Sequence, residues 1–286
     1  MKSAAMMHPA AALPEPGPIG IFDSGYGGLT VFKEIAGHLP QYDYIYFGDN
    51  ARAPYGIRSF ETIYKYTLEC VRHLFGMGCN LIILACNTAS AKALRSIQQN
   101  DLAQNGKLHR VLGVKRPTTE MIGTVTRTGH VGILATTGTV QSQSYVLEIH
   151  KFFPEVQVFQ QDCPMWVPLI ENNEHQSRGA DFFVEKCIQA LLKQSDQIDT
   201  IVLGCTHYPL MYNKIRQFVP AHIRLISQGE IVADSLVDYL RRHPEIEAIC
   251  SKNHRYKYFT TESPEVFDSK ARLFYGRNIH SKHFEL

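Results

Sequence analysis

Two cysteines of this 286-residue chain occupy nearly the same local sequence. Residues 81–88 (LIILACNT) and residues 200–207 (TIVLGCTH) each combine an apolar run, typical of a buried strand, with a cysteine and small polar residues directly after it. A cysteine between the end of a strand and the start of a helix meets the positive end of the helix dipole, which lowers the pKa of its thiol. We therefore predict that Cys86 and Cys205 form thiolates readily.

The other cysteines lack this pattern. Seven cysteines at irregular spacings, with no C-x-x-C pair, argue against both a disulfide framework and a zinc ribbon, and reduced thiols are typical of cytoplasmic proteins. We interpret Cys70, Cys79 and Cys187 as packing residues. No Cys/His cluster has the spacing of metal ligands, so we expect no metal site.

Three kinds of chemistry use cysteines at such positions. A hydrolase pairs one nucleophilic cysteine with a histidine base, as Cys205 and His207 suggest, but residues two apart need not face each other and a second equivalent cysteine would be redundant. A metal site needs three or four ligands. Removal and return of a proton at a carbon stereocentre needs a base and an acid on opposite faces of the carbon. The matched pair favours this last chemistry.

Polar motifs also follow the first two predicted strands. Residues 23–28 (DSGYGG) form a glycine-rich turn whose backbone N–H groups suit a small anion such as a carboxylate. Thr30 stands where a dinucleotide-binding motif needs its third glycine, and no P-loop lysine follows, so a nucleotide site is not indicated. A tight turn without a ligand is the alternative. The loop at residues 48–56 contains Tyr55, which can hydrogen-bond to a ligand or close over it.

Short apolar runs alternate with longer amphipathic stretches from residue 18 onward, which predicts an α/β fold with mostly parallel sheets. We predict strands at residues 19–23, 44–47, 81–85, 131–135, 156–160, 201–204 and 223–227. Helices are predicted at residues 59–75 and 182–192. The repeated cysteine motif indicates two similar doubly wound domains, with the active site in the cleft between them at the carboxyl ends of the strands.

Charge and hydropathy exclude several classes of protein. The formal net charge is +2, from 29 Lys and Arg against 27 Asp and Glu, and no basic run indicates nucleic acid binding. No apolar stretch approaches the roughly 20 residues of a membrane span. Three prolines in residues 1–17 favour a flexible extension over a signal peptide. We expect a cytoplasmic protein that binds neither nucleic acid nor membranes.

Four motifs, in order along the chain, carry a resemblance to a known family: residues 21–28 (IFDSGYGG), 48–56 (GDNARAPYG), 85–90 (ACNTAS) and 204–210 (GCTHYPL). In these motifs, and over about residues 18–275, the chain resembles the bacterial glutamate racemases. The resemblance implies interconversion of L- and D-glutamate, which supplies D-glutamate for peptidoglycan, without pyridoxal phosphate or metal. It also implies two domains in which the chain returns to the first near its end. We expect residues 18–112 plus 228–286 in the first domain, 113–227 in the second, and 1–17 as an extension.

The resemblance also implies residue roles. Cys86 and Cys205 would be the acid/base pair, with Asp23 assisting Cys86 and His207 assisting Cys205. Cys86 would act on D-glutamate and Cys205 on L-glutamate. The glutamate site would be lined by Asp23, Ser24, Tyr55, Gly56, Asn87, Thr88, Thr206 and His207.

Three further residues match the family with weaker support. Glu171 would be a second assistant of Cys205, and Thr139 and Ser142 would contact the substrate. Alternatives remain for two of the helpers, since His207 could cap the helix that Pro209 opens and Glu171 could be a solvated acid.

The chain departs from the family pattern at a few positions. Asn50 and Ala53 stand where the family usually has threonine and valine, which a loop tolerates. Lys115 and Arg116 put two cations where an apolar and a varied residue are usual, so they would affect the hinge or a contact of the expected homodimer. A racemase of aspartate or another amino acid, and a non-catalytic binding protein on the same scaffold, stay open as alternatives.

Overall fold

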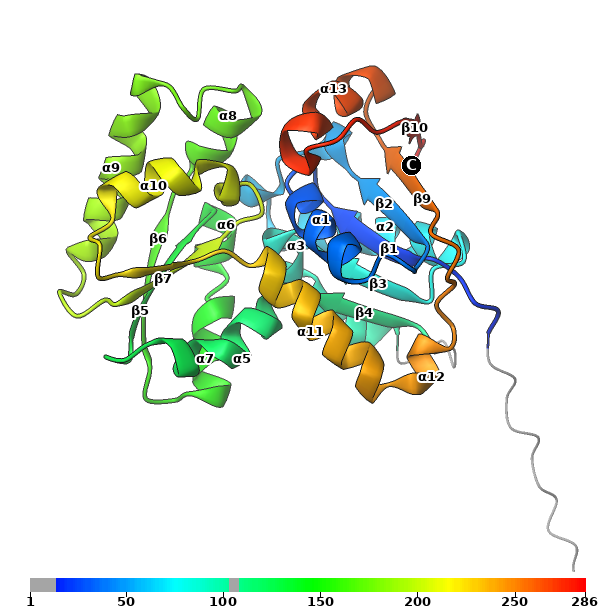
Figure 1. Ribbon diagram of the computed structural model, residues 1–286, viewed down its shortest axis with the longest axis horizontal. Coiled ribbons are helices and arrows are strands. Elements are labelled where there is room, and N and C mark those ends of the chain that lie inside the picture. Colours follow the sequence, from blue (N-terminus) through cyan, green and yellow to red (C-terminus); the bar gives the residue numbers. More distant parts are fainter. Residues whose placement is uncertain (1–13, 103–107) are drawn as a thin grey trace, which may run out of the picture.

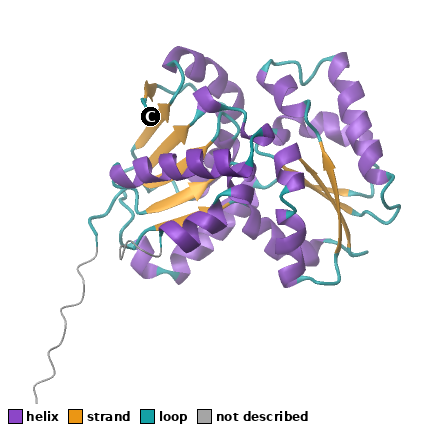
Figure 2. Ribbon diagram, turned by 180° about the vertical axis from the view of Figure 1, so that it is seen from behind, coloured by secondary structure: helices purple, strands orange, loops and turns teal. Residues whose placement is uncertain are grey.

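Two parallel β-sheets, each covered by helices, form the framework of the protein (Figure 1). The computed structural model describes residues 14–102 and 108–286. In the described residues the strand orders are β10-β9-β2-β1-β3-β4 and β6-β5-β7-β8, and every neighbouring pair is parallel. Figure 2 shows the two helix-covered sheets side by side from behind. The predicted α/β fold with two mostly parallel domains is confirmed.

The first sheet and its helices come from both ends of the chain. Its strands are β1 (Ile19–Asp23), β2 (Tyr44–Gly48), β3 (Leu81–Leu84), β4 (Arg110–Gly113), β9 (Tyr256–Thr260) and β10 (Ser281–His283). The helices around it are α1 (Gly28–His38), α2 (Phe60–Gly76), α3 (Asn87–Lys92), α4 (Leu94–Ser96), α11 (Gly229–Arg242), α12 (Pro244–Glu247) and α13 (Pro264–Tyr275).

The second sheet comes from the middle of the chain. Its strands are β5 (His130–Ala135), β6 (Gln157–Asp162), β7 (Thr200–Gly204) and β8 (Arg224–Ile226). Its helices are α5 (Lys115–Val125), α6 (Thr137–Gln141), α7 (Ser144–Phe152), α8 (Trp166–Glu171), α9 (Arg178–Leu192) and α10 (Tyr212–Phe218). The exact domain boundaries stay a prediction. Of the predicted extension, residues 1–13 lie outside the described residues, while Gly17 pairs with Cys250.

The two sheets share one strand order. In each, the first strand of the domain lies between the second and third, and the fourth lies beyond the third, as β2-β1-β3-β4 and β6-β5-β7-β8. Cys86 lies two residues beyond the last residue of β3, with Ala85 between them, and Cys205 is the first residue after β7. The cysteines therefore occupy equivalent places, because parallel strands bring all their carboxyl ends to one edge of a sheet.

The predicted strands and helices are largely present, with shifted ends. Strand β3 stops one residue early, β6 covers 157–162 rather than 156–160, and β8 covers only 224–226. Strands β4, β9 and β10 were missed. Most side chains of these three strands are half-exposed or exposed, so the apolar run that marks a buried strand is absent. Strands β4 and β10 lie at the edges of the first sheet, and β9 is next to β10.

Local sequence explains where helix α2 begins. Ser59 accepts a hydrogen bond from Thr62 N with its side chain, which satisfies one of the free N–H groups of the first turn. The buried face of the helix includes Ile63, Val71 and Leu74. Burial of such a stripe, rather than helix propensity alone, is what stabilises a helix of this length.

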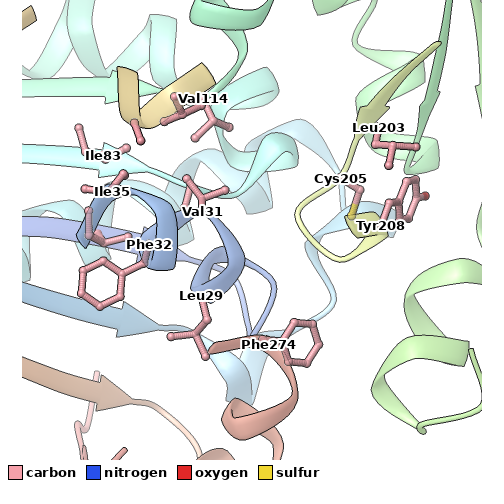
Figure 3. Close-up of a cluster of buried hydrophobic side chains, with 14 of the residues drawn as sticks. Leu29, Val31, Phe32, Ile35, Ile83, Val114, Leu203, Cys205, Tyr208 and Phe274 are labelled. Atoms are coloured by element: carbon pink, nitrogen blue, oxygen red, sulfur yellow. The ribbon is translucent and has the colours of Figure 1, made fainter. Parts of the chain in front are cut away.

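A continuous cluster of buried apolar side chains runs from one domain into the other (Figure 3). Leu29, Phe32 and Ile83 belong to the first domain, and Leu203 and Tyr208 belong to the second. This cluster joins the cores of the two domains. Within residues 14–102 and 108–286, no helix is long and apolar enough to cross a membrane.

Candidate active site

Cys86 is the N-cap residue of α3 and is buried. Its Sγ lies 3.3 Å from Ser24 Oγ and accepts a hydrogen bond from Ala89 N at 3.4 Å. The strand end and the helix start thus position the thiol as the sequence predicts, and the turn after β1 supplies its nearest polar side chain.

The pKa of Cys86 moves opposite to the prediction. Burial raises the pKa of its thiol to about 12, with a further rise from Asp23, while hydrogen bonds from Ser24 and Ala89 N lower it by less. The predicted lowering is therefore wrong for Cys86, because full burial can shift a pKa by several units whereas a helix terminus contributes about 1 kcal/mol or less. Cys86 holds its proton at neutral pH and can donate it.

Asp23 ends β1 and lies beneath the same turn. Gly25 N donates to Asp23 Oδ2 at 2.9 Å, and Oδ1 makes no hydrogen bond of ordinary geometry within the described residues. Burial raises the pKa of the Asp23 carboxyl, against the opposing effects of His207 and of the backbone at Gly28 and Gly25. One buried carboxyl oxygen is thus available to a substrate or a proton.

Cys205 begins a chain of three polar groups in the second domain. Its Sγ lies 3.9 Å from His207 Nδ1, and His207 Nε2 lies 2.9 Å from Glu171 Oε1. The expectation that residues two apart need not face each other does not apply here, since the chain turns into the short helix Tyr208–Met211. Figure 3 shows Cys205 beside Tyr208 at the end of β7.

The imidazole of His207 has a strongly shifted pKa. Burial lowers the pKa of its imidazole, but hydrogen bonds and charge interactions with Cys205 and Glu171 outweigh burial and raise the pKa to about 10. The imidazolium therefore persists at neutral pH and lies where it stabilises negative charge on Cys205. His207 does not act as a helix cap, because its side chain makes no cap hydrogen bond. Glu171 is not simply a solvated acid, because its carboxylate is bound to the His207 imidazole.

The cysteine turn of the second domain packs against the glycine-rich turn of the first. Thr30 Oγ1 donates to Thr206 O at 2.8 Å, and a Cβ at Gly27 would overlap Thr206 Oγ1 and His207. Only glycine permits this approach. Thr206 and His207 are thus brought next to the turn that begins with Asp23.

Asn87 and Thr88 already have partners across the interface. Thr88 Oγ1 lies 3.0 Å from Thr136 Oγ1 and 3.5 Å from Thr139 Oγ1, which belong to the second domain. Asn87 Oδ1 accepts a hydrogen bond from Tyr145 OH. The predicted substrate residues of the first domain therefore also link the two domains.

Tyr55 uses its hydroxyl away from a ligand. The hydroxyl donates to Asp49 Oδ2, which also accepts a hydrogen bond from Arg52 Nε at 2.7 Å. The ring is buried, and the next residue, Gly56, lies against Thr136 and Gly138. The backbone of the Tyr55–Gly56 turn, rather than the phenol, is what this loop presents at the interface.

Some residues at the interface were not predicted. Thr136 follows β5 as Ser24 follows β1, so its place after a predicted strand was an available signal. Tyr145 and Gln228 carried no local signal. Ser142, one of the weaker candidates, donates to Thr139 O at 2.6 Å and lies 2.9 Å from Ser144 Oγ.

The two unusual cations have different surroundings. Lys115 is buried, and burial lowers the pKa of its ammonium to about 7. Arg116 is paired with Glu120 at 2.7 Å on the same helix. Both line a groove between α3, α5, α7 and α11, next to the link between the domains.

All seven cysteines are free.

Comparison with known proteins identifies the family. The Asp/Glu/Hydantoin racemase family model matches residues 29–236. A glutamate racemase of Geobacter metallireducens is 39% identical over 261 residues, which cover 91% of this chain and 93% of the relative. The chain belongs to the Asp/Glu/hydantoin racemase family. Within this family, a glutamate racemase of Streptococcus suis is 38% identical over 270 residues, covering 94% of this chain and 98% of the relative.

Solved structures of Asp/Glu/hydantoin racemases have the same fold. A glutamate racemase isoform of Bacillus anthracis has a TM-score of 0.85 at 33% identity, covering 94% of this chain and 97% of that chain. The Francisella tularensis glutamate racemase, solved in complex with D-glutamate, has a TM-score of 0.81 at 31% identity and the same coverage. An aspartate racemase of Picrophilus torridus, at 17% identity and a TM-score of 0.53, shares the fold alone. The predicted resemblance to bacterial glutamate racemases is confirmed.

Proposed function

We propose that the protein is a glutamate racemase that interconverts L- and D-glutamate by proton transfer between two thiols, without a cofactor. One observation carries the proposal: Cys86 and Cys205 follow equivalent strands of two domains that meet at Thr30 and Thr206. Each thiol also has an ionisable group beside it in the site, Asp23 for Cys86 and His207 for Cys205. A matched pair of acid/base groups is what inversion at a carbon stereocentre requires.

The two thiols take different roles in each direction. For L-glutamate, Cys205 Sγ removes the α-proton while the His207 imidazolium stabilises the thiolate, and Cys86 delivers its proton to the opposite face. For D-glutamate, Cys86 is the base and Asp23, a buried carboxylate whose charge interacts with the thiol, accepts its proton. Each turnover transfers one proton to the base and one from the acid, so that the reverse reaction restores the starting state.

The α-proton of an amino acid is very weakly acidic, so the site has to stabilise the developing carbanion. The second N–H of Asn87 and the hydroxyls of Thr88 and Thr206 would donate to the α-carboxylate. The turn at Ser24 or the Tyr55–Gly56 backbone would hold the side-chain carboxylate. Closure of the two domains would exclude water and strengthen each of these contacts.

Glutamate is the proposed substrate because relatives that are 39% and 38% identical, and that this chain covers almost completely, are named glutamate racemases. The test is circular dichroism of L-glutamate incubated with purified protein and no added cofactor. Loss of the signal to zero supports the proposal, and a stable signal refutes it. A parallel assay with L-aspartate separates glutamate from the shorter substrate, since the same two-thiol chemistry would act on either.

The remaining proposals concern context. We propose that the enzyme acts in the cytoplasm, supplies D-glutamate for peptidoglycan, and forms a homodimer. The domains are proposed to comprise residues 18–112 plus 228–286 and residues 113–227. Analytical ultracentrifugation tests the homodimer, and a single monomeric species across micromolar concentrations would refute it.

A further inference from the structure

A closed cycle of three hydrogen bonds joins the turn that carries Cys86 to the second domain. Asn87 Nδ2 donates to Gln228 Oε1 at 2.8 Å, Gln228 Nε2 donates to Tyr145 OH at 2.9 Å, and Tyr145 OH donates to Asn87 Oδ1 at 2.8 Å. All three side chains are buried. Hydrogen bonds in such a buried network strengthen one another, and loss of one member leaves the others unpaired.

The surrounding groups determine the direction of the cycle. Gln228 Nε2 also lies 3.3 Å from Val114 O and 3.1 Å from Thr118 Oγ1, and because the carbonyl can only accept, the amide nitrogen faces that side. Its two hydrogens point toward these acceptors and Tyr145 OH, which is the shortest of the three contacts. Gln228 Oε1 must then be the acceptor for Asn87 Nδ2, which leaves Asn87 Oδ1 to accept from Tyr145. The amide of Asn87 is thereby held in one orientation, with its second N–H unused by the cycle.

Tyr145 touches both cysteine turns. Its hydroxyl binds Asn87, the residue after Cys86, and its ring packs on Gly204, the residue before Cys205. A Cβ at position 204 would lie 3.2 Å from Tyr145 Cε2, so glycine lets the ring approach closely. Burial raises the pKa of Tyr145 well above its ordinary value, with a further rise from Cys205, so the hydroxyl keeps its proton and remains a donor.

We propose that Tyr145 and Gln228 are positioning residues of the racemase reaction, which orient Asn87 and set the spacing between the Cys86 turn and the Cys205 turn. The inference rests on the proposed function, in which both thiols must reach one α-carbon from opposite faces. Proton transfer depends steeply on the distance between donor and acceptor, so a loosened cycle slows the chemical step more than it weakens substrate binding.

Tyr145→Phe removes one hydroxyl and keeps the ring on Gly204. We expect kcat to fall by about tenfold or more, KM to change by less than about threefold, and the primary isotope effect with α-deuterated glutamate to rise. Since two enantiomers are equal in free energy, kcat/KM must fall by the same factor in both directions. The matched control is Tyr44→Phe, which removes another buried tyrosine hydroxyl, bonded to Leu39 O at 2.8 Å. We expect this control to lower the melting temperature and leave kcat and the isotope effect unchanged.

The pH dependence of activity in the Gln228→Glu variant distinguishes a positioning role from a purely structural one. A protonated glutamic acid has one acceptor and one donor oxygen and can complete the cycle, whereas the carboxylate cannot donate to Tyr145. We expect the activity of this variant relative to wild type to rise as pH falls and the introduced carboxylate gains its proton. Gln228→Ala should be impaired by a constant factor at every pH, because it can make no such bond.

The outcomes separate this inference from the proposed function. Wild-type protein that racemises glutamate, together with a Tyr145→Phe variant of unchanged kcat and isotope effect, would overturn the positioning role alone. Wild-type protein that does not racemise glutamate would overturn both. If Tyr145→Phe fails to fold, the comparison of Gln228→Glu with Gln228→Ala decides: equal, pH-independent losses contradict the inference, and recovery at low pH supports it.

Discussion

Replacing Glu171 by glutamine should lower the pKa of His207 and weaken catalysis at alkaline pH. Glu171 Oε1 lies 2.9 Å from His207 Nε2, and the pKa of His207 is raised to about 10 by its partners Cys205 and Glu171 despite burial. Glutamine has nearly the same shape and still accepts a hydrogen bond from Nε2, so the variant removes the charge and keeps the contact.

The size of the effect follows from the environment of the pair. Two unit charges about 4 Å apart interact by about 4 kcal/mol at an effective dielectric constant of about 20. The Glu171 side chain is 24% exposed, so solvent screens part of this attraction. We therefore expect the pKa of His207 to fall by about one to two units, which corresponds to about 1.4–2.7 kcal/mol.

The assay is the pH profile of kcat/KM for glutamate between pH 6 and 10, which reports the ionisations of the free enzyme. The alkaline limb should move down by about one to two units, with about a two- to tenfold loss of kcat/KM at pH 9. Glu174→Gln is the control, because it removes an exposed acid three residues away. An alkaline limb that is the same in wild type and Glu171→Gln would refute the assignment of Glu171 as the partner that keeps His207 protonated.

Three further predictions test the acid/base pair, the coupling of stability to pH and a helix start. Cys86→Ala and Cys205→Ala should each abolish racemisation and leave the circular dichroism of the fold unchanged; either variant at near wild-type rate would contradict the two-thiol mechanism, as would deuterium incorporation from solvent with complete retention. Because the pKa of His207 is raised from 6.5 to about 10 on folding, its stabilisation is fully present below pH 6.5 and is lost as pH rises through 10. Urea unfolding should therefore show a wild-type advantage over His207→Gln, on the order of a few kcal/mol, that shrinks from pH 6.5 to 10; a pH-independent difference would count against it. Ser59→Ala removes the cap of α2 and should lower the unfolding free energy by about 1 kcal/mol in the same assay, with unchanged kcat.

Local pattern was enough to predict the elements that carry the chemistry. The apolar runs before Cys86 and Cys205 predict buried parallel strands, and parallel strands bring their carboxyl ends to one edge whatever the details of packing. The amphipathic face of α2 likewise depends on residues within a few positions of each other. Such features are properties of short stretches, so the sequence by itself determined them.

Contacts between distant residues and exclusion of water were decided only by the tertiary structure. The pairing of Glu171 with His207, and the cycle of Asn87, Tyr145 and Gln228, join residues from different elements, and no spacing in the sequence indicates them. The direction of the Cys86 pKa shift was predicted wrongly for the same reason. A helix start is visible in the sequence, but how completely the rest of the chain removes water from the thiol is known only once the two domains are packed together.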